Sequence, residues 1–240
     1  MPELFYDFHI HSCLSPCADD DMTPANIIGM AQLKGLQVIA ITDHNSCRNC
    51  APAIGLGNEA GILVIPGMEL TTKEEVHVVC LFLTLADALA FDHYVYQKLQ
   101  KIENNTLIFG NQLVVDQEEQ ILEYEPYLLI NATAIAFDEV ASLVRSFHGI
   151  MIPAHIDKSS NSVLSNLGFI PEDSQFTCVE VKDLNNLSTI QVRNPYVNQC
   201  HVIHDSDAHN LGGINEAVNR ISVNERSVKE VLAALINRPI

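Results

Sequence analysis

The 240-residue sequence predicts an α/β fold built on a parallel sheet, and two observations support it. Apolar runs rich in β-branched residues alternate with segments of helical periodicity, which is the order that produces parallel strands with crossover helices. Histidines and carboxylates repeatedly follow the apolar runs. In a parallel β/α barrel, functional side chains gather at the C-terminal ends of the strands, so the second observation favours a barrel. We expect a single domain over residues 1–240.

The first third of the chain follows this alternation closely. Thr23-Pro24 is a typical helix start, with an N-capping hydroxyl followed by proline at the first helical position. Gly35 and Gly61 are typical helix ends. The expected elements are a strand over 4–11, a helix from Thr23-Pro24 to Gly35, a strand over 36–42, a helix over about 50–60, a strand over 62–65 that runs into Pro66-Gly67-Met68-Glu69, and a strand over 76–83.

Residues of about 85–136 interrupt the alternation, and we interpret them as an insertion. Residues 87–103 have helical periodicity, whereas 110–115 and 127–131 predict short strands around an acidic turn over 116–125. A segment of this length is too long for an ordinary connection. It is either a lid over the site or a structural elaboration of the barrel.

The alternation resumes at Phe137. The expected elements are a helix to Phe147, a strand over 150–153, a helical segment around 162–167, a strand over 177–181, a strand over 200–203 and a closing amphipathic helix over 227–236. Each of the strands at 150–153 and 200–203 is followed within four residues by histidine and aspartate. These segments therefore extend both the barrel and its candidate site.

The charge balance restricts the partners. Thirteen Lys and Arg against 30 Asp and Glu give a formal net charge of −17, which disfavours stable binding of nucleic acid or of an anionic membrane surface. The N-terminus lacks the basic start and apolar run of a signal peptide, and no apolar run is long enough to cross a bilayer. Seven cysteines, an odd number, argue against a disulfide framework. We expect a cytoplasmic protein.

Four of the cysteines occur in two spaced pairs. Cys13 and Cys17 are three residues apart, and Cys47 and Cys50 are two apart. A four-thiolate zinc or iron–sulfur site is one interpretation. We favour the interpretation that they are free thiols in loops near the histidines, because structural four-cysteine sites normally have tighter paired spacings.

The histidines supply the strongest functional signal. In a strand, His9 and His11 project from the same face, so they could bind one metal ion or simply end the strand. The other candidate ligands also follow expected strands; together with this pair they are His9, His11, His44, Glu69, His155, Asp207 and His209. His77 stands at the beginning of its apolar run and does not fit this pattern.

Imidazole and carboxylate are ligands suited to Zn²⁺, Mn²⁺ or Fe²⁺. Six histidines with several carboxylates exceed the needs of one ion, so we expect two to three divalent ions. A pair of such ions can polarise a phosphoryl group and generate a bridging hydroxide at neutral pH. A serine or cysteine nucleophile is then unnecessary.

Several motifs, in this order, carry a family resemblance: Asp7-Phe8-His9-Ile10-His11-Ser12, Thr42-Asp43-His44-Asn45, Pro66-Gly67-Met68-Glu69, His77, Pro153-Ala154-His155 and Ser206-Asp207-Ala208-His209. The sequence resembles the PHP (polymerase and histidinol phosphatase) family of metal-dependent phosphoesterases from residue 4 to about 210. The resemblance implies a distorted (β/α)7 TIM-like barrel with a trinuclear metal centre at the C-terminal ends of the strands.

The resemblance also implies a division of the ligands among the three ions. His9, His11 and Asp207 would bind the first ion, Glu69 would bridge it to the second, and His77 and His155 would complete the second site. His44 and His209 would bind the third ion.

A loop residue should complete the third site, and here the sequence departs from the family pattern of His or Asp. Asp19 is our choice because a carboxylate suits the site; Asp20 is second and Cys17 third.

Few basic residues lie near these motifs. Arg48 and Lys158 are the first candidates for contacts with a phosphate, and Arg193 is a weaker one; each has the alternative of being a solvated surface charge. His204 is a candidate proton donor close to the last motif, and Asp43 and Asp157 are candidates for orienting ligating imidazoles.

We therefore expect hydrolysis of a small phosphomonoester, such as a nucleotide, sugar phosphate or histidinol phosphate, by attack of a metal-bridging hydroxide. One alternative is a phosphodiesterase or 3′–5′ exonuclease acting on oligonucleotides. An alternative of another class is a metal-binding regulatory module without turnover.

Overall fold

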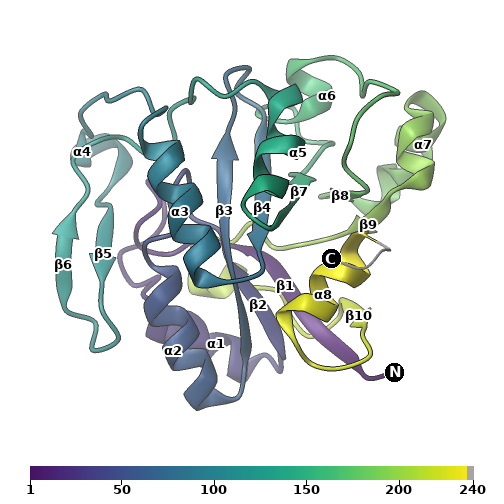
Figure 1. Ribbon diagram of the computed structural model, residues 1–240. Coiled ribbons are helices and arrows are strands. Elements are labelled where there is room, and N and C mark those ends of the chain that lie inside the picture. Colours follow the sequence, from purple (N-terminus) through teal and green to yellow (C-terminus); the bar gives the residue numbers. More distant parts are fainter. Residues whose placement is uncertain (237–240) are drawn as a thin grey trace.

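The computed structural model describes residues 1–236 and contains a curled six-stranded sheet in the order β10-β1-β2-β3-β4-β7 (Figure 1). The strands are β1 (Glu3–Ile10), β2 (Val38–Ile41), β3 (Leu63–Thr71), β4 (His77–Phe82), β5 (Leu113–Val115), β6 (Ile121–Tyr124), β7 (Gly149–Pro153), β8 (Cys178–Glu180), β9 (His201–Ile203) and β10 (Arg220–Ser222). The α-helices are α1 (Pro24–Leu33), α2 (Cys50–Ala60), α3 (Leu85–Tyr96), α4 (Thr106–Phe109), α5 (Phe137–Ser146), α6 (Val163–Asn166), α7 (Leu187–Arg193) and α8 (Val228–Ile236). Short 3-10 turns lie at Leu184–Asn186, Pro195–Gln199 and Leu211–Gly213.

The sheet is mixed rather than parallel throughout, so that expectation is wrong in part. β1, β2 and β3 are parallel, but β4 runs antiparallel to both β3 and β7. Only a short turn separates β3 from β4, and such a turn permits a hairpin but not a crossover. Thr71 at the end of β3 pairs with His77 at the start of β4. The first residue of β4 therefore lies at the same edge as the C-terminal ends of its neighbours.

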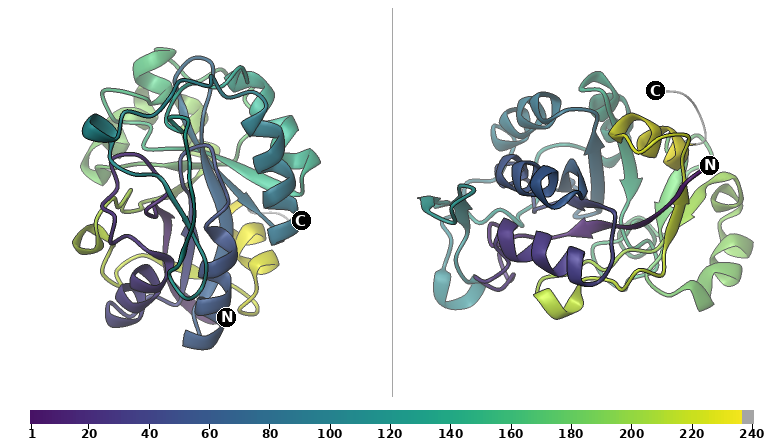
Figure 2. Two further views of the ribbon diagram at one scale, coloured as in Figure 1. Left: turned by 90° about the vertical axis from the view of Figure 1, so that its left-hand side faces the viewer. Right: turned by 90° about the horizontal axis from the view of Figure 1, so that it is seen from below.

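The sheet curls toward a barrel without closing. β8 and β9 form a separate parallel pair, joined to the β7 side by the Ile156 N to Glu180 O hydrogen bond of 2.9 Å. On the other side, Ile10 and Ala208 form an isolated parallel bridge. Helices surround the curled sheet (Figure 2). The fold is thus the predicted TIM-like α/β architecture in an open form.

Two apolar cores hold the sheet in place. Successive side chains of each strand point to opposite faces of the sheet, as the pleat requires. In β4, for example, Val79 packs in the cluster that also contains Phe8 and residues of α8, whereas Val78 packs in the cluster shared with α1, α2, α3 and α5. This arrangement leaves the strand ends free to carry polar side chains.

The predicted boundaries are confirmed where local signals are strong. Thr23 Oγ1 accepts a hydrogen bond from Asn26 N at 3.3 Å, and Gly61 ends α2 with φ of 71°. Among residues 1–236, no helix is long and apolar enough to cross a membrane. All seven cysteines are free.

The observed helix and strand boundaries differ most from the predicted ones within residues 85–136. The predicted helix ends early, at Tyr96, because the following chain pairs with another segment through the bridge between Leu99 and Thr133. The predicted acidic turn contains β6. Asp116 Oδ1 accepts from Glu118 N and Gln120 N, which closes a tighter turn and lets β6 pair with β5.

The strand predicted over 127–131 is absent from the described residues. Tyr127 makes only an isolated bridge to Glu103. Leu129 and Ile130 form a turn there, and Asn131 N donates to Leu128 O at 3.3 Å.

Candidate metal centre

Five buried histidines meet around Glu69, which is itself fully buried on β3. Glu69 Oε1 lies 3.2 Å from His9 Nε2, 3.0 Å from His77 Nδ1 and 3.2 Å from His155 Nε2. Its second oxygen, Oε2, lies 3.3 Å from His11 Nε2 and 3.0 Å from His44 Nδ1. One carboxylate thus faces five imidazoles that come from three strand ends, those of β1, β2 and β7, and from the start of β4.

Asp207 extends this arrangement toward solvent. Its Oδ1 lies 3.3 Å from His11 Nε2 and 3.5 Å from His9 Nε2, and its side chain is 9% exposed. His209 stacks on the His11 ring with centroids 4.0 Å apart and is 29% exposed. The exposed fractions place the mouth of the site on the Asp207 and His209 side.

The ligand atoms fall into three groups compact enough to hold an ion. These groups are His9, His11, Glu69 and Asp207; His44, Glu69 and His77; and His11, His44 and His209. The first group is the set expected for the first ion. The second contains His44 in place of the expected His155, which nevertheless contacts Glu69 at 3.2 Å.

The donors fit divalent cations. His77 Nε2 and His155 Nδ1 are buried without a hydrogen-bond partner among the described residues. The same holds for His44 Nδ1 and Glu69 Oε2, which lie 3.0 Å apart but not in hydrogen-bonding geometry. Leaving a buried polar atom unpaired costs about 1–3 kcal/mol, so several at one place indicate that something else satisfies them. Neutral imidazole nitrogens and carboxylate oxygens are donors that Zn²⁺, Mn²⁺ and Fe²⁺ accept. A group of divalent ions meets both requirements.

The electrostatics of the centre follow from burial and from its charged partners. Burial raises the pKa of the Glu69 carboxyl, but the surrounding imidazoles outweigh it and hold that pKa well below the usual range. Burial lowers the pKa of His44 to about 3 and of His209 to about 4. Burial also opposes the charged form of His9, but Glu180, Glu69 and Asp207 outweigh it and raise the pKa of His9.

Backbone strain accompanies the ligands. His155 has φ of 30° and Asp207 φ of 54°, both in the left-handed region that side chains with a Cβ rarely adopt. Asn45, next to His44, has φ of 48°. Its side chain donates to Leu129 O and Asn131 O, which ties the His44 loop to the 85–136 segment. Strain of this kind persists where surrounding contacts impose it and clusters at functional sites.

Supporting residues orient the first pair of histidines, and one of them was missed in the sequence. His9 Nδ1 donates to Glu180 Oε2 at 2.7 Å, so in the neutral imidazole Nε2 carries the lone pair that faces the centre. Glu180 is fully buried on β8. In the sequence, Glu180 is a carboxylate at the end of an otherwise apolar strand, and the apolar pattern gave no reason to select it.

His11 has a comparable support. Its Nδ1 donates to Ser15 Oγ at 2.9 Å, and Ser15 Oγ donates to Asp43 Oδ1 at 2.8 Å. Asp43 therefore orients an imidazole through a serine rather than directly. Asp157, the second candidate for this role, instead accepts from the backbone amides of Lys182 and Asp183.

The basic candidates lie in different surroundings. Lys158 Nζ donates to Asp207 Oδ2 at 2.9 Å and its side chain is 40% exposed, so it lies at the mouth. Arg48 forms ion pairs with Glu123 and Glu125 of the 85–136 segment. Arg193 is exposed in the last turn of α7.

The remaining candidates lie outside the three groups. His204 Nδ1 donates to Val181 O at 3.0 Å. Asp19, Asp20 and Cys17 are exposed, and within residues 1–236 none of them belongs to a compact ligand group. The Asp19 backbone amide does donate to His209 O at 2.9 Å, which keeps the loop beside the mouth. The two cysteine pairs also form no such group among the described residues.

Comparison with known proteins defines the class of this fold and site. The PHP domain family matches residues 7–234, nearly the whole chain. The chain therefore belongs to the PHP family, whose members are metal-dependent hydrolases of the phosphoesterase class.

Individual relatives are more distant. An uncharacterised protein of Methanocaldococcus jannaschii is 37% identical over 76 residues, which are 28% of this chain and 44% of that protein. A 5′-3′ exoribonuclease of Haemophilus influenzae is 33% identical over 77 residues, covering 31% of this chain and 27% of that protein. The matched segments thus span less than half the length of either curated relative.

Among solved structures, the lesion-specific endonuclease EndoQ of Pyrococcus furiosus superposes with a TM-score of 0.69 at 18% identity. The superposition covers 98% of this chain and 56% of that one. At this identity the likeness concerns the fold.

Proposed function

We propose that the chain hydrolyses phosphomonoesters of small molecules, using two to three divalent ions held around Glu69. The observation that carries the proposal is the convergence of five imidazoles on this one buried carboxylate. When bound, the ions supply a hydroxide nucleophile at neutral pH and charge neutralisation for the phosphoryl oxygens. Zn²⁺, Mn²⁺ and Fe²⁺ all suit this donor set.

The side chains of the proposed centre have separate tasks. His9, His11, Asp207 and Glu69 hold the first ion, with Glu180 fixing the His9 tautomer through its 2.7 Å contact. Glu69, His77 and His155 hold the second ion, to which His44 lies close enough to contribute. His44 and His209 hold the third, with Asp19 as the proposed loop ligand.

Lys158 is the proposed contact for the substrate. Its ammonium group pairs with Asp207 at the mouth, and a phosphate oxygen arriving there would compete for the same charge-assisted hydrogen bond. Because burial closes the rest of the centre, the phosphate of a small molecule or a chain terminus can approach it most readily.

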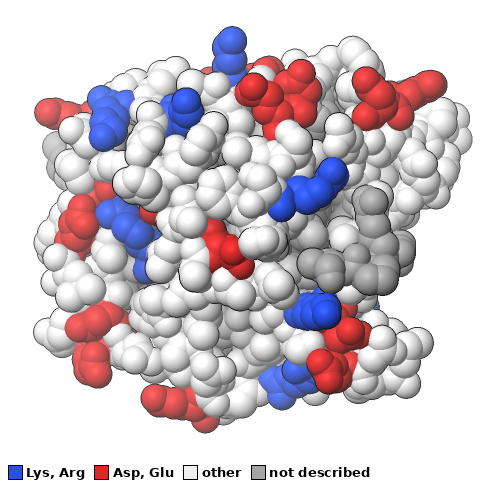
Figure 3. All heavy atoms as spheres, in the orientation of Figure 1, with Lys and Arg blue, Asp and Glu red and all other residues white. Residues whose placement is uncertain are grey.

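The surface charge supports a small substrate. On the face shown in Figure 3, basic side chains alternate with acidic ones, and the net charge of the chain is −17. A polynucleotide track normally requires a continuous basic groove.

A second candidate, phosphodiester hydrolysis of nucleic acid, is favoured by the relatives. One is named as an exoribonuclease, and an EndoQ structure contains a 27-mer duplex with an abasic lesion at the active site. The same centre could hydrolyse either ester, so an assay with both kinds of substrate is needed to distinguish the two functions.

The test is a panel assay with metal-reconstituted protein. Histidinol phosphate, a nucleoside monophosphate and a sugar phosphate represent monoesters; bis(p-nitrophenyl) phosphate, single-stranded RNA and an abasic duplex represent diesters. We expect turnover of monoesters that disappears in Glu69→Gln. Turnover of diesters alone would favour the second candidate, and no turnover with normal metal content would contradict both.

A further inference from the structure

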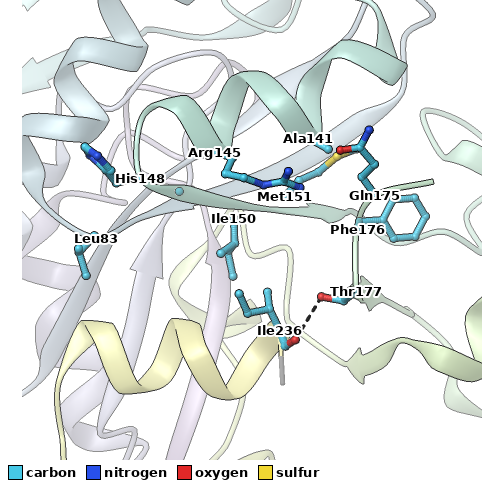
Figure 4. Close-up of a pocket in the computed structure, with 11 residues that line it drawn as sticks. Leu83, Ala141, Arg145, His148, Ile150, Met151, Gln175, Phe176, Thr177 and Ile236 are labelled. Carbon is cyan, nitrogen blue, oxygen red and sulfur yellow. Dashed lines mark hydrogen bonds between the residues drawn. The ribbon is translucent and has the colours of Figure 1, made fainter. Parts of the chain in front are cut away.

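A cavity lies at the start of β7, whereas His155 of the metal centre follows the end of the same strand. It has a volume of about 420 Å³ and is lined by apolar side chains that include Leu83, Ile150, Phe176 and Ile236 (Figure 4). This volume is within the range of small-molecule sites. None of the proposed metal ligands lines it.

The cavity exists because the barrel does not close. β7 is bonded to β4 along one edge, and β8 belongs to a different sheet. The two strands are joined near their C-terminal ends by Ile156 N and Glu180 O, and the described residues form no ladder toward their starts. The cavity lies in the resulting gap between the starts of β7 and β8, which we call the seam. Ile150 belongs to one core and Met151 to the other, so the seam reaches between the two apolar layers.

One cation in this lining has no acidic partner. Arg145 stands in the last turn of α5, and within residues 1–236 no ion pair involves it. Figure 4 shows its side chain extending over β7 beside Met151. The neighbouring His148 is engaged, because its Nδ1 lies 2.9 Å from Asp87 Oδ1. The seam thus combines apolar walls with a single available guanidinium.

We propose that the seam between β7 and β8 binds a small amphipathic carboxylate, with its charge on Arg145 and its apolar chain between Ile150, Phe176 and Ile236. A guanidinium pairs with a carboxylate through two parallel hydrogen bonds. One available cation matches a single negative charge. A phosphate monoester carries nearly two charges at neutral pH, and Asp87 nearby would oppose the second.

The experiment uses octanoate as the probe and metal-loaded protein labelled with ¹³C at the methionine methyl groups. Of the five methionines, Met151 lines the cavity and Met68 precedes Glu69. We expect octanoate to shift the Met151 resonance in a saturable manner and to leave Met68 in place. Octan-1-ol, which lacks the charge, should bind about tenfold more weakly or worse.

Two variants separate the seam from other sites. Arg145→Gln should weaken octanoate binding about tenfold or more, because it removes the charge and keeps most of the length of the side chain. Arg193→Gln is the matched control, since Arg193 is also exposed in the last turn of a helix; its affinity should equal that of the wild type. Ala141→Phe should fill the cavity from α5 and abolish binding, with a melting curve to verify folding.

Four results would overturn the proposal. Octanoate could leave the Met151 resonance unshifted, or shift Met68 instead because the carboxylate binds the metal centre. Arg145→Gln could bind octanoate as tightly as the wild type. Octan-1-ol could bind as tightly as octanoate, which would remove the role of the charge.

Discussion

The neighbourhood of Glu69 and the loop over residues 17–21 both contain side chains of the types that bind metals, but those around Glu69 are buried and those of the loop are mostly exposed. Glu69 is fully buried and faces five imidazoles. Asp19 and Asp20 are exposed, and Asp20 accepts from Asn111 Nδ2 at 2.7 Å. Ligand chemistry is therefore similar in the two regions, and the difference lies in burial and convergence.

The difference arises from the elements that carry the side chains. Strand ends on one sheet edge are held by the ladder and by the cores beneath them, so their side chains arrive already oriented. The loop gains its position from fewer contacts, among them the bond from Asp19 N to His209 O. We expect the strand-borne ligands to dominate metal affinity and the loop to adjust the occupancy of one site.

The largest effect is expected from Glu69→Gln. This change keeps the shape but removes the negative charge that all five imidazoles share. Bound metal and hydrolytic activity should both fall at least about a hundredfold. Metal analysis by mass spectrometry after dialysis measures the first; retained metal with a native circular dichroism spectrum would contradict the central role of Glu69.

His77→Ala should have the next largest effect, since it removes one proposed ligand of the second ion. Metal stoichiometry should fall by about one ion and activity about a hundredfold. His93→Ala is the control, because His93 is exposed on α3 and belongs to no ligand group. Equal metal contents in the two variants would show that the start of β4 does not serve the centre.

Glu180→Gln tests a positioning residue that does not contact the substrate. Loss of its charge should weaken metal binding by about 10–100-fold, the usual cost of removing the partner of a ligating histidine. Glu180→Asp should restore part of the affinity. Unchanged affinity in titration calorimetry, with activity alone reduced, would assign Glu180 another role.

Metal binding should also depend on pH in a defined direction. Glu180, Glu69 and Asp207 outweigh burial and raise the pKa of His9, so the metal-free protein holds a proton on this imidazole more tightly than a free histidine does. Binding requires the neutral imidazole and must release that proton. Affinity should therefore fall as the pH falls, by about tenfold per unit for each released proton. Calorimetry in buffers of different ionisation enthalpy counts the protons, and a count of zero would contradict this account.

Asp19→Ala should produce the smallest effect, a loss of no more than one ion with the first site still filled. Asp20→Ala and Cys17→Ala should leave the stoichiometry unchanged, because Asp19 is the proposed ligand. A loss in Cys17→Ala alone would move the assignment to the thiolate.

The sequence was sufficient for the alternation of strands and helices, and the motifs that it contains lie together around Glu69. The direction of β4 was not accessible, because an apolar run has the same pattern in either direction. His77 was the sign of the reversal, since it fits the strand-end pattern only when β4 runs antiparallel.

Glu180 was inaccessible for another reason. Its partner His9 is 171 residues away, and only the folded chain brings the two together. Likewise, the position of β6 depended on the turn that Asp116 closes through its side chain, which composition alone could not locate.

The most direct test of the central claim is anomalous diffraction from crystals grown with Mn²⁺ or Zn²⁺. We predict two ions with Glu69 oxygens in their coordination spheres, at about 2.0–2.2 Å, and His9 and His11 on the first of them. Ions bound only along the 17–21 loop, with none in contact with Glu69, would contradict it.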